Sequence, residues 1–317
     1  MLLLKNTGRL DSFRLSVDMA AVLRYYSLVI EPSWSGYADP RLLAFCSFRS
    51  HPIVIMATCP EDYSFLTRLD SNLRPIAIGA SDWVDPQVFR PIPGIEKKFD
   101  AVMIARWTVF KRHHVLVRSL RRINDPSFQV AIIAQNQPGA SNRPAILSMI
   151  DAAGLGNQVT VMEDLQPAEV NTVLNQSKVN VLLSRQEGSN RSLFEGFFAG
   201  VPGLALRNNL GIPKAYFTPK TGRLVEECEL PAALLEFRKS WQEFAPRLWA
   251  LRNIAPELTT AKLNRVLKEL AEARQEPWTR DIVAKCNCPE LLYYPDQSAG
   301  SGMPPADARL SFPPAST

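Results

Sequence analysis

The chain of 317 residues is poor in the side chains that hold metal ions and disulfides. It contains three histidines and five cysteines, the latter at positions 46, 59, 228, 286 and 288. An odd number of widely spaced cysteines provides no disulfide framework and favours a reducing compartment. Cys286 and Cys288 form the closest pair, but no histidine lies near them in the sequence, so we expect no metal site.

The chain also lacks long apolar runs. No stretch of the sequence approaches the roughly 20 apolar residues that a membrane-spanning helix needs. The opening Met-Leu-Leu-Leu leads directly into Lys5 and Asn6, which is too short for the apolar core of a signal peptide. We therefore expect a cytoplasmic protein, with peripheral contact at the inner membrane surface as the one membrane role left open.

A strong excess of charge of one sign is missing too. The net charge is +5, and basic residues gather between Lys97 and Arg122. This excess is small and is not interleaved with aromatic residues, so it does not indicate nucleic-acid binding. It suits an anionic ligand such as a nucleoside diphosphate, or weak adhesion to acidic lipid.

Strand-like and helix-like segments alternate along most of the chain. From Asp100 onward we expect strands at 101–105, 129–134, 159–162, 179–183, 203–206 and 222–225, separated by helices at 111–123, 143–153, 167–176, 190–200, 230–241 and 260–274. This alternation predicts a parallel sheet with helices on both faces. Before Asp100 we expect strands at 27–30, 52–57 and 75–78, with helices at 11–25, 41–48 and 60–69.

These segments divide the chain into three expected parts. Residues 1–95 form a first lobe and residues 96–275 a complete second lobe. Residues 276–317 form a C-terminal segment, and its tail from Pro295 is rich in Pro, Ser, Gly and Ala, a composition typical of chains without fixed structure.

The segment that follows the expected strand 179–183 carries two glutamates. A polar turn leads into a helix that begins at position 190 or 191 and ends at Gly200, since Pro202 cannot continue it. Glu187 lies in the turn and Glu195 about one turn into the helix. In an open α/β sheet such a turn lies at the carboxyl edge of the strands, where ligands bind.

The surroundings of Glu195 distinguish it from a surface residue. Taken alone, the pair could be a loop glutamate and a solvated helix glutamate. Glu195 is flanked, however, by four bulky apolar residues, Leu193, Phe194, Phe197 and Phe198. A carboxylate among such neighbours is costly to bury, which favours a functional role.

This Glu-x7-Glu element, followed by Gly-Val-Pro, resembles the sugar-nucleotide site of retaining glycosyltransferases with the two-lobed GT-B fold, family 4 (group 1) type. The resemblance implies that Glu195 accepts hydrogen bonds from the ribose hydroxyls and that Glu187 contacts the donor sugar. The backbone amides of Gly188, Ser189 and Asn190 would face the sugar or the phosphate. The implied fold has two Rossmann-like lobes, of which the N-terminal one is truncated here.

Two cations follow the first strand of the second lobe. Arg106 and Lys111 lie at the start of an expected helix, where positive charge reduces stability unless an anion is bound. Surface charges are the common explanation for such a pair. In the family, an Arg and a Lys at this junction hold the donor diphosphate, and Arg106 and Lys111 match in position and type. The resemblance implies that they stabilise the leaving diphosphate without a metal.

The resemblance extends over roughly residues 75 to 240. Ile78 to Pro91 resembles the crossing between the lobes, and 210–216 and 221–225 resemble the stretch after the glutamates. Leu165 follows a strand where relatives place the base, and could equally be a core residue. His51, the histidine before the crossing, is either a sugar contact or an ordinary loop residue. In relatives, the last helix often returns to the first lobe.

The resemblance therefore implies a hexosyltransferase that uses a UDP- or GDP-sugar donor and no other cofactor, and the composition leads us to expect no nucleic acid. The acceptor would be a glycan, lipid-linked or small-molecule hydroxyl, in polysaccharide or glycolipid synthesis. Because the first lobe is short, a non-catalytic nucleotide-sugar-binding module is the alternative. A sugar-nucleotide epimerase would need further acid or base residues facing the sugar, and the sequence offers none.

Overall fold

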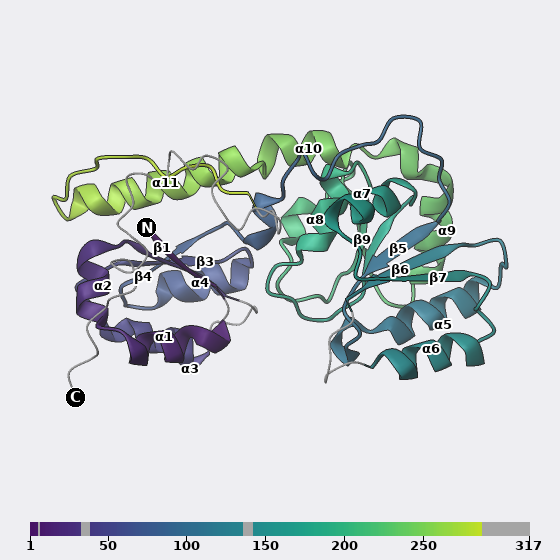
Figure 1. Ribbon diagram of the computed structural model, residues 1–317, viewed down its shortest axis with the longest axis horizontal. Helices are drawn as coiled ribbons and strands as arrows, with labels where there is room; N and C mark the ends of the chain where they lie inside the picture. Colours follow the sequence, from purple (N-terminus) through teal and green to yellow (C-terminus); the bar gives the residue numbers. More distant parts are fainter. Residues whose placement is uncertain (6, 33–38, 136–141, 287–317) are drawn as a thin grey trace. The chain divides into compact units, whose positions relative to one another are not determined.

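The computed structural model describes residues 1–5, 7–32, 39–135 and 142–286. The Pro-rich tail from Pro295 and Cys288 lie outside these residues. The described residues form two compact units, Met1–Gly79 with the chain from Thr259 onward, and Ala80–Leu258. The expected boundaries, at 95 and 275, differ because the residues from Ala80 onward pack with the second unit and those from Thr259 onward with the first. Each unit is built on a parallel sheet with flanking helices (Figure 1), which confirms the α/β expectation.

The first unit contains a four-stranded parallel sheet in the order β1-β2-β3-β4. The strands are β1 Leu2–Lys5, β2 Leu28–Glu31, β3 Ile53–Met56 and β4 Leu73–Ile76. We did not predict β1, because a run of three leucines next to Lys5 shows no strand periodicity. The helices are α1 Leu10–Ser16, α2 Met19–Tyr25, α3 Pro40–Leu43, α4 Pro60–Arg68 and, continuing from the second unit, α11 Pro256–Ala273.

The single helix expected at 11–25 is two helices. Val17 is extended, and the carboxylate of Asp18 accepts hydrogen bonds from the backbone N–H groups of Ala20 and Ala21, at 2.9 and 3.1 Å. Asp18 thus caps a new helix, which is a common use of aspartate at this position. Figure 1 shows α11 on the opposite side of this sheet from α1 and α3, and Leu263, Leu267 and Ala271, four residues apart, are buried.

The second unit contains a six-stranded parallel sheet in the order β10-β9-β8-β5-β6-β7. The strands are β5 Ala101–Ile104, β6 Val130–Ala134, β7 Val159–Glu163, β8 Asn180–Leu182, β9 Gly203–Leu206 and β10 Gly222–Val225. The chain winds outward from β5 in one direction and from β8 in the other. This is the doubly wound parallel sheet that we expected. The direction in which successive strands are added to the sheet reverses between β5 and β8, and we call this place the reversal point.

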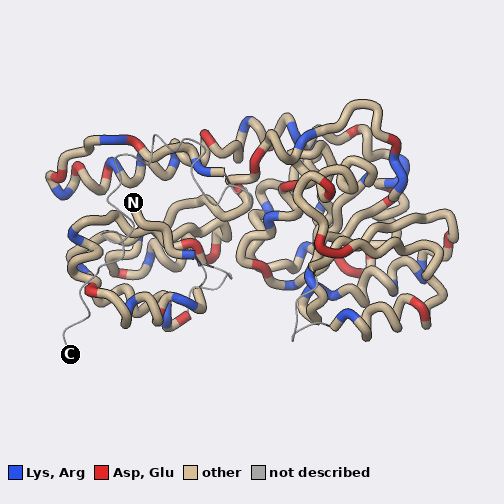
Figure 2. The backbone as a smooth tube through the Cα atoms, viewed as in Figure 1, with Lys and Arg blue, Asp and Glu red and all other residues tan. Residues whose placement is uncertain are grey.

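Helices cover both faces of the second sheet. One apolar core lies against α5 His113–Ile123, α6 Arg143–Ala152 and α9 Leu230–Ser240. The other lies against α7 Pro167–Asn175, α8 Arg191–Phe198 and α10 Pro246–Asn253. We did not predict α10, whose apolar residues do not gather on one side. Figure 2 shows acidic and basic residues interspersed in each unit.

Close backbone packing fixes the edge of the second sheet. Gly222 pairs with Gly203 across β10 and β9. A Cβ on Gly222 would lie 2.0 Å from the carbonyl oxygen of Gly203, so no other residue fits there without moving a strand. Similarly, a Cβ on Gly196 would lie 2.8 Å from the side chain of Asn180, so this glycine lets α8 approach β8 closely.

Candidate functional site

The candidate residues follow β5 and β8, the two central strands of the second sheet. From β5 the chain runs to α5 on one face, and from β8 it runs to α8 on the other. Between such strands the connections diverge and leave a crevice at the carboxyl ends, which is where open α/β sheets bind ligands. Residues 105–112 and 183–190 both lie at this point.

Lys111 and Glu187 form an ion pair across this point. Lys111 ends a short 3-10 turn, Val109–Lys111, and its Nζ lies 2.6 Å from Oε1 of Glu187. The hydroxyl of Ser184 donates to the same oxygen at 2.6 Å. The side chains of Lys111 and Glu187 are only 12% and 8% exposed, so water screens their attraction weakly.

A second set of bonds fixes the backbone that carries Glu187. Its N–H donates to the carbonyl of Leu210 at 2.8 Å, and the N–H of Leu210 donates to the carbonyl of Arg185 at 2.7 Å. The side chain of Asn209, fully buried, donates to the carbonyl of Ser184 at 2.7 Å. We missed Asn209 and Ser184, because nothing in their local sequence separates them from ordinary turn residues.

Helix α8 begins at the end of this loop. The Asn190 side chain accepts from the N–H of Leu193 at 2.9 Å, and this cap explains why the helix starts at Arg191, as predicted. Within the described residues, the backbone amides of Gly188, Ser189 and Asn190 donate no hydrogen bond. Together with the positive end of the helix dipole, free amides at this point favour an anion.

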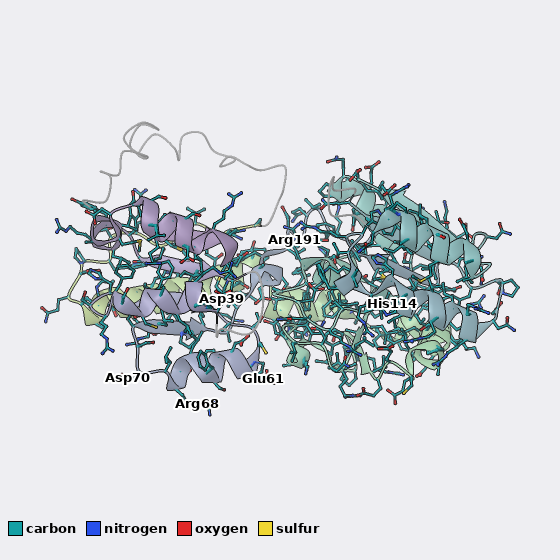
Figure 3. All side chains as sticks on the ribbon, turned by 90° about the horizontal axis from the view of Figure 1, so that it is seen from below. Asp39, Glu61, Arg68, Asp70, His114 and Arg191 are labelled. Atoms are coloured by element: carbon teal, nitrogen blue, oxygen red, sulfur yellow. The ribbon has the colours of Figure 1, made fainter. Side chains whose placement is uncertain are left out.

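Glu195 is buried on α8, as its neighbours in the sequence predicted. It is 8% exposed, and its nearest charged partner is Arg191, whose Nε lies 3.1 Å from Oε1. Burial raises the pKa of the Glu195 carboxyl, and Arg191 opposes that shift. Arg191, labelled in Figure 3, is half exposed, so among the described residues the carboxylate has one counterion, and water screens it partly.

Three other candidate residues make no contact with the Lys111–Glu187 ion pair among the interactions of the described residues. Arg106 is exposed in the same loop as Lys111, and its side chain makes no hydrogen bond or ion pair with the described residues. Leu165, after β7, is half-buried against the core that α7 and α8 cover. His51 lies in the first unit, where its Nδ1 is 2.9 Å from the hydroxyl of Ser50.

A further polar cluster lies at the ends of β5 and β7. The indole N–H of Trp107 donates to Glu163 at 2.6 Å, and Nε of Arg143 donates to both carboxylate oxygens, at 2.8 and 2.9 Å. Arg143 lowers the pKa of Glu163, and burial lowers the pKa of His113, whose ring lies 5.2 Å from that of Trp107, to about 4. We did not predict this cluster, because Arg143 and Glu163 read as separate surface charges.

Two features are absent from the described residues. No three histidine, cysteine, aspartate or glutamate side chains gather there as a metal ion would require. No helix in that part of the chain combines the length and apolarity needed to cross a membrane.

The two parallel sheets with their flanking helices have the arrangement of the GT-B fold, which confirms the expected fold. Residues 86–241 match the family model "Glycosyl transferases group 1", so this part of the chain is similar to the domain that the model describes. The match contains every candidate residue except His51. No protein with a curated description matches the chain by sequence.

Solved glycosyltransferase structures share the fold at low sequence identity. A sucrose-phosphate synthase from Thermosynechococcus elongatus superposes with a TM-score of 0.64 at 16% identity, over 83% of this chain and 77% of its own. HepE from Anabaena, in complex with UDP and glucose, superposes with a TM-score of 0.66 at 14% identity, over 84% of this chain and 78% of HepE. TarM from S. aureus, in complex with UDP and alpha-GlcNAc-glycerol, gives 0.61 at 16%, over 77% of this chain but only 50% of TarM.

Proposed function

We propose that the protein transfers a hexose from a UDP- or GDP-sugar to an acceptor hydroxyl with retention, as a family 4 enzyme of polysaccharide or glycolipid synthesis in the cytoplasm. The observation that carries this proposal is the Lys111–Glu187 ion pair between β5 and β8, in the part of the chain that matches the group 1 glycosyltransferase model. A cation and a hydrogen-bond acceptor for sugar hydroxyls are held there side by side, on two loops that are both anchored to the sheet.

The diphosphate is proposed to bind between the two loops. Lys111 supplies a point charge, exposed Arg106 supplies a planar guanidinium, and the amides of residues 188–190 supply further donors. As the bond from the sugar to the diphosphate breaks, negative charge develops on the leaving oxygen. Lys111, which Glu187 already holds in place, stabilises this charge together with Arg106, without a metal ion.

The two glutamates would bind hydroxyl groups. Glu187 accepts from the donor sugar once the diphosphate takes over Lys111 as its counterion, so binding exchanges one ion pair for another. Glu195 accepts hydrogen bonds from the ribose hydroxyls. Its buried carboxylate, which is paired with Arg191, then gains further hydrogen-bond donors. Attack of the acceptor hydroxyl from the face that the diphosphate leaves would retain the configuration, so neither glutamate acts as a nucleophile.

The ligands of the structural neighbours support a nucleotide-sugar donor. HepE was crystallised with UDP and glucose, and with UDP-glucose. TarM was crystallised with UDP and a GlcNAc-glycerol, a pairing that supports a glycan acceptor. Leu165 would contact the nucleotide base, because its half-buried side chain lies just after β7, at the carboxyl edge of the same sheet.

A donor screen followed by product analysis tests the proposal. Thermal shifts with UDP, GDP and their sugars should identify one nucleotide that raises the melting temperature, since a ligand of the folded state stabilises it. NMR of the released or transferred sugar should then show the donor's anomeric configuration. An inverted product would refute retention, and binding without hydrolysis or transfer would favour a non-catalytic module. No shift with any nucleotide would contradict the proposal as a whole.

A further inference from the structure

The first residues of the second unit contact the loop that carries Glu187. Ser81 lies in the 3-10 turn η3, Ala80–Trp83, directly after Gly79, with which the first unit ends. Its side chain is fully buried, and its Oγ lies 2.6 Å from Oγ of Ser189. The backbone N–H of Ser81 also donates to Oγ of Ser189, at 3.1 Å. Two hydrogen bonds thus join the start of this unit to the loop before α8.

These bonds belong to a series that converges on the carboxylate of Asp82. Because Ser189 Oγ accepts the N–H of Ser81, its own hydrogen is available for Ser81 Oγ. Ser81 Oγ in turn donates to the carboxylate of Asp82 at 3.5 Å, and the hydroxyl of Tyr216 donates to the other oxygen of Asp82 at 3.0 Å. Every hydroxyl hydrogen therefore has an acceptor, and such a series is stronger in a buried site than in water.

The two ends of this hydrogen-bonded series, Ser189 and Tyr216, both lie against α8 or its N-terminal cap. Ser189 immediately precedes Asn190, which caps the helix, and the ring of Tyr216 packs edge-on against Phe194, with centroids 5.6 Å apart. The backbone amides of residues 188–190 bind no carbonyl among the described residues. The two hydrogen bonds of the Ser189 side chain therefore tie the middle residue of this stretch to Ser81.

We propose that Ser81 is a positioning residue for donor binding. It holds Ser189, and thereby keeps the amides of Gly188 to Asn190 directed toward the place where Lys111 and Glu187 meet. This inference rests on the proposed function, because it assigns the amides to the donor. Amides stabilise a diphosphate well only when their direction is fixed before the ligand arrives.

A double-mutant cycle with Ser81→Ala and Ser189→Ala tests the inference. We expect each single variant to weaken the binding of UDP or GDP, measured by calorimetry on folded protein, about 5- to 10-fold. The double variant should bind no more weakly than Ser189→Ala, since that change alone removes both hydrogen bonds and Ser81→Ala removes one of the same two. The KM for the donor should rise with the Kd. Ser240→Ala is the control, because its hydroxyl only donates to the carbonyl of Glu236 at the exposed end of α9.

A structural role alone would give a different result. Ser81→Ala would then lower the fraction of folded protein, and hence the measured stoichiometry, without changing the Kd or KM of the folded molecules. Unchanged affinity in both single variants, or losses that add in the double variant, would overturn the inference while leaving the proposed function intact. If wild-type protein binds no nucleotide, that result contradicts both the inference about Ser81 and the proposed function. Should Ser81→Ala not fold, Ser189→Ala removes the same contact from the less buried partner and decides the question.

Discussion

Lys111 and Glu187 are 76 residues apart in the sequence, yet Nζ of Lys111 lies 2.6 Å from Oε1 of Glu187. Lys111 follows β5 and Glu187 follows β8, the two adjacent strands from which the chain winds outward in opposite directions. The fold itself therefore brings the two residues together. Both side chains are largely shielded from water. Two opposite charges held this way are costly to separate, unless a ligand replaces the partner of each.

Glu195→Gln should stabilise the free protein and weaken nucleotide binding. Burial raises the pKa of Glu195 above its ordinary value of 4.5, so the folded state binds the proton more tightly than the unfolded state does. The contribution of Glu195 to stability is then fully present below pH 4.5 and is lost as the pH rises through the folded-state pKa. Glutamine does not titrate, and its advantage should therefore grow with pH.

Thermal unfolding at several pH values measures this difference. At pH 7 we expect a gain of a few degrees, given that about 1 kcal/mol shifts the melting temperature by ~2–4 °C in a unit of this size. Nucleotide affinity should fall about tenfold, because an amide oxygen accepts more weakly than a carboxylate. Exposed Glu243→Gln is the control and should change neither quantity. A variant that loses stability at pH 7 would disprove this account of Glu195.

Arg106→Ala should weaken nucleotide binding without changing stability. Arg106 is exposed and has no side-chain partner within the described residues, so its removal leaves no group unsatisfied. If its guanidinium binds the diphosphate, affinity for UDP or GDP should drop about tenfold in a calorimetric titration, and more steeply at low salt. Arg121→Ala, another exposed arginine on the same connection, should bind like wild type. Equal affinities in the two variants would remove Arg106 from the site.

Gly222→Ala should destabilise the second unit severely. The new Cβ would approach the carbonyl oxygen of Gly203 to 2.0 Å, a backbone clash that side-chain rotation cannot relieve. We expect a loss of about 3 kcal/mol or more in urea unfolding. Gly156→Ala is the matched control, since its nearest contact would be a side-chain oxygen of Asp151 at 3.9 Å. Similar unfolding midpoints for the two variants would show that β9 and β10 pack less closely than described.

Local sequence signals predicted most of the fold. Buried parallel strands such as Val130–Ala134 are continuous β-branched and apolar runs, and Asn190 and Gly200 mark the limits of α8 by capping. Such signals failed where an element is short or lacks one apolar face, as in β1 and α10. They also could not show where the units divide, because that depends on which residues pack together.

The candidate site was predictable only in part. The sequence indicates which side chains follow which strands, and the phenylalanines next to Glu195 predict that it is buried. The ion pair of Lys111 with Glu187 and the support from Ser184, Asn209 and Ser81 depend on contacts between distant segments. No local pattern records such contacts.

Calorimetric titration of UDP and GDP into wild-type protein and Lys111→Met tests the central claim most directly. Methionine keeps much of the apolar stem of Lys111 and removes its charge, and the exposed Lys239→Met serves as the control. We predict that wild type and the control bind one of the two nucleotides at one site per chain, and that Lys111→Met binds it at least about tenfold more weakly while remaining folded. Equal affinity in all three proteins, or no binding of either nucleotide by wild type, would contradict the account.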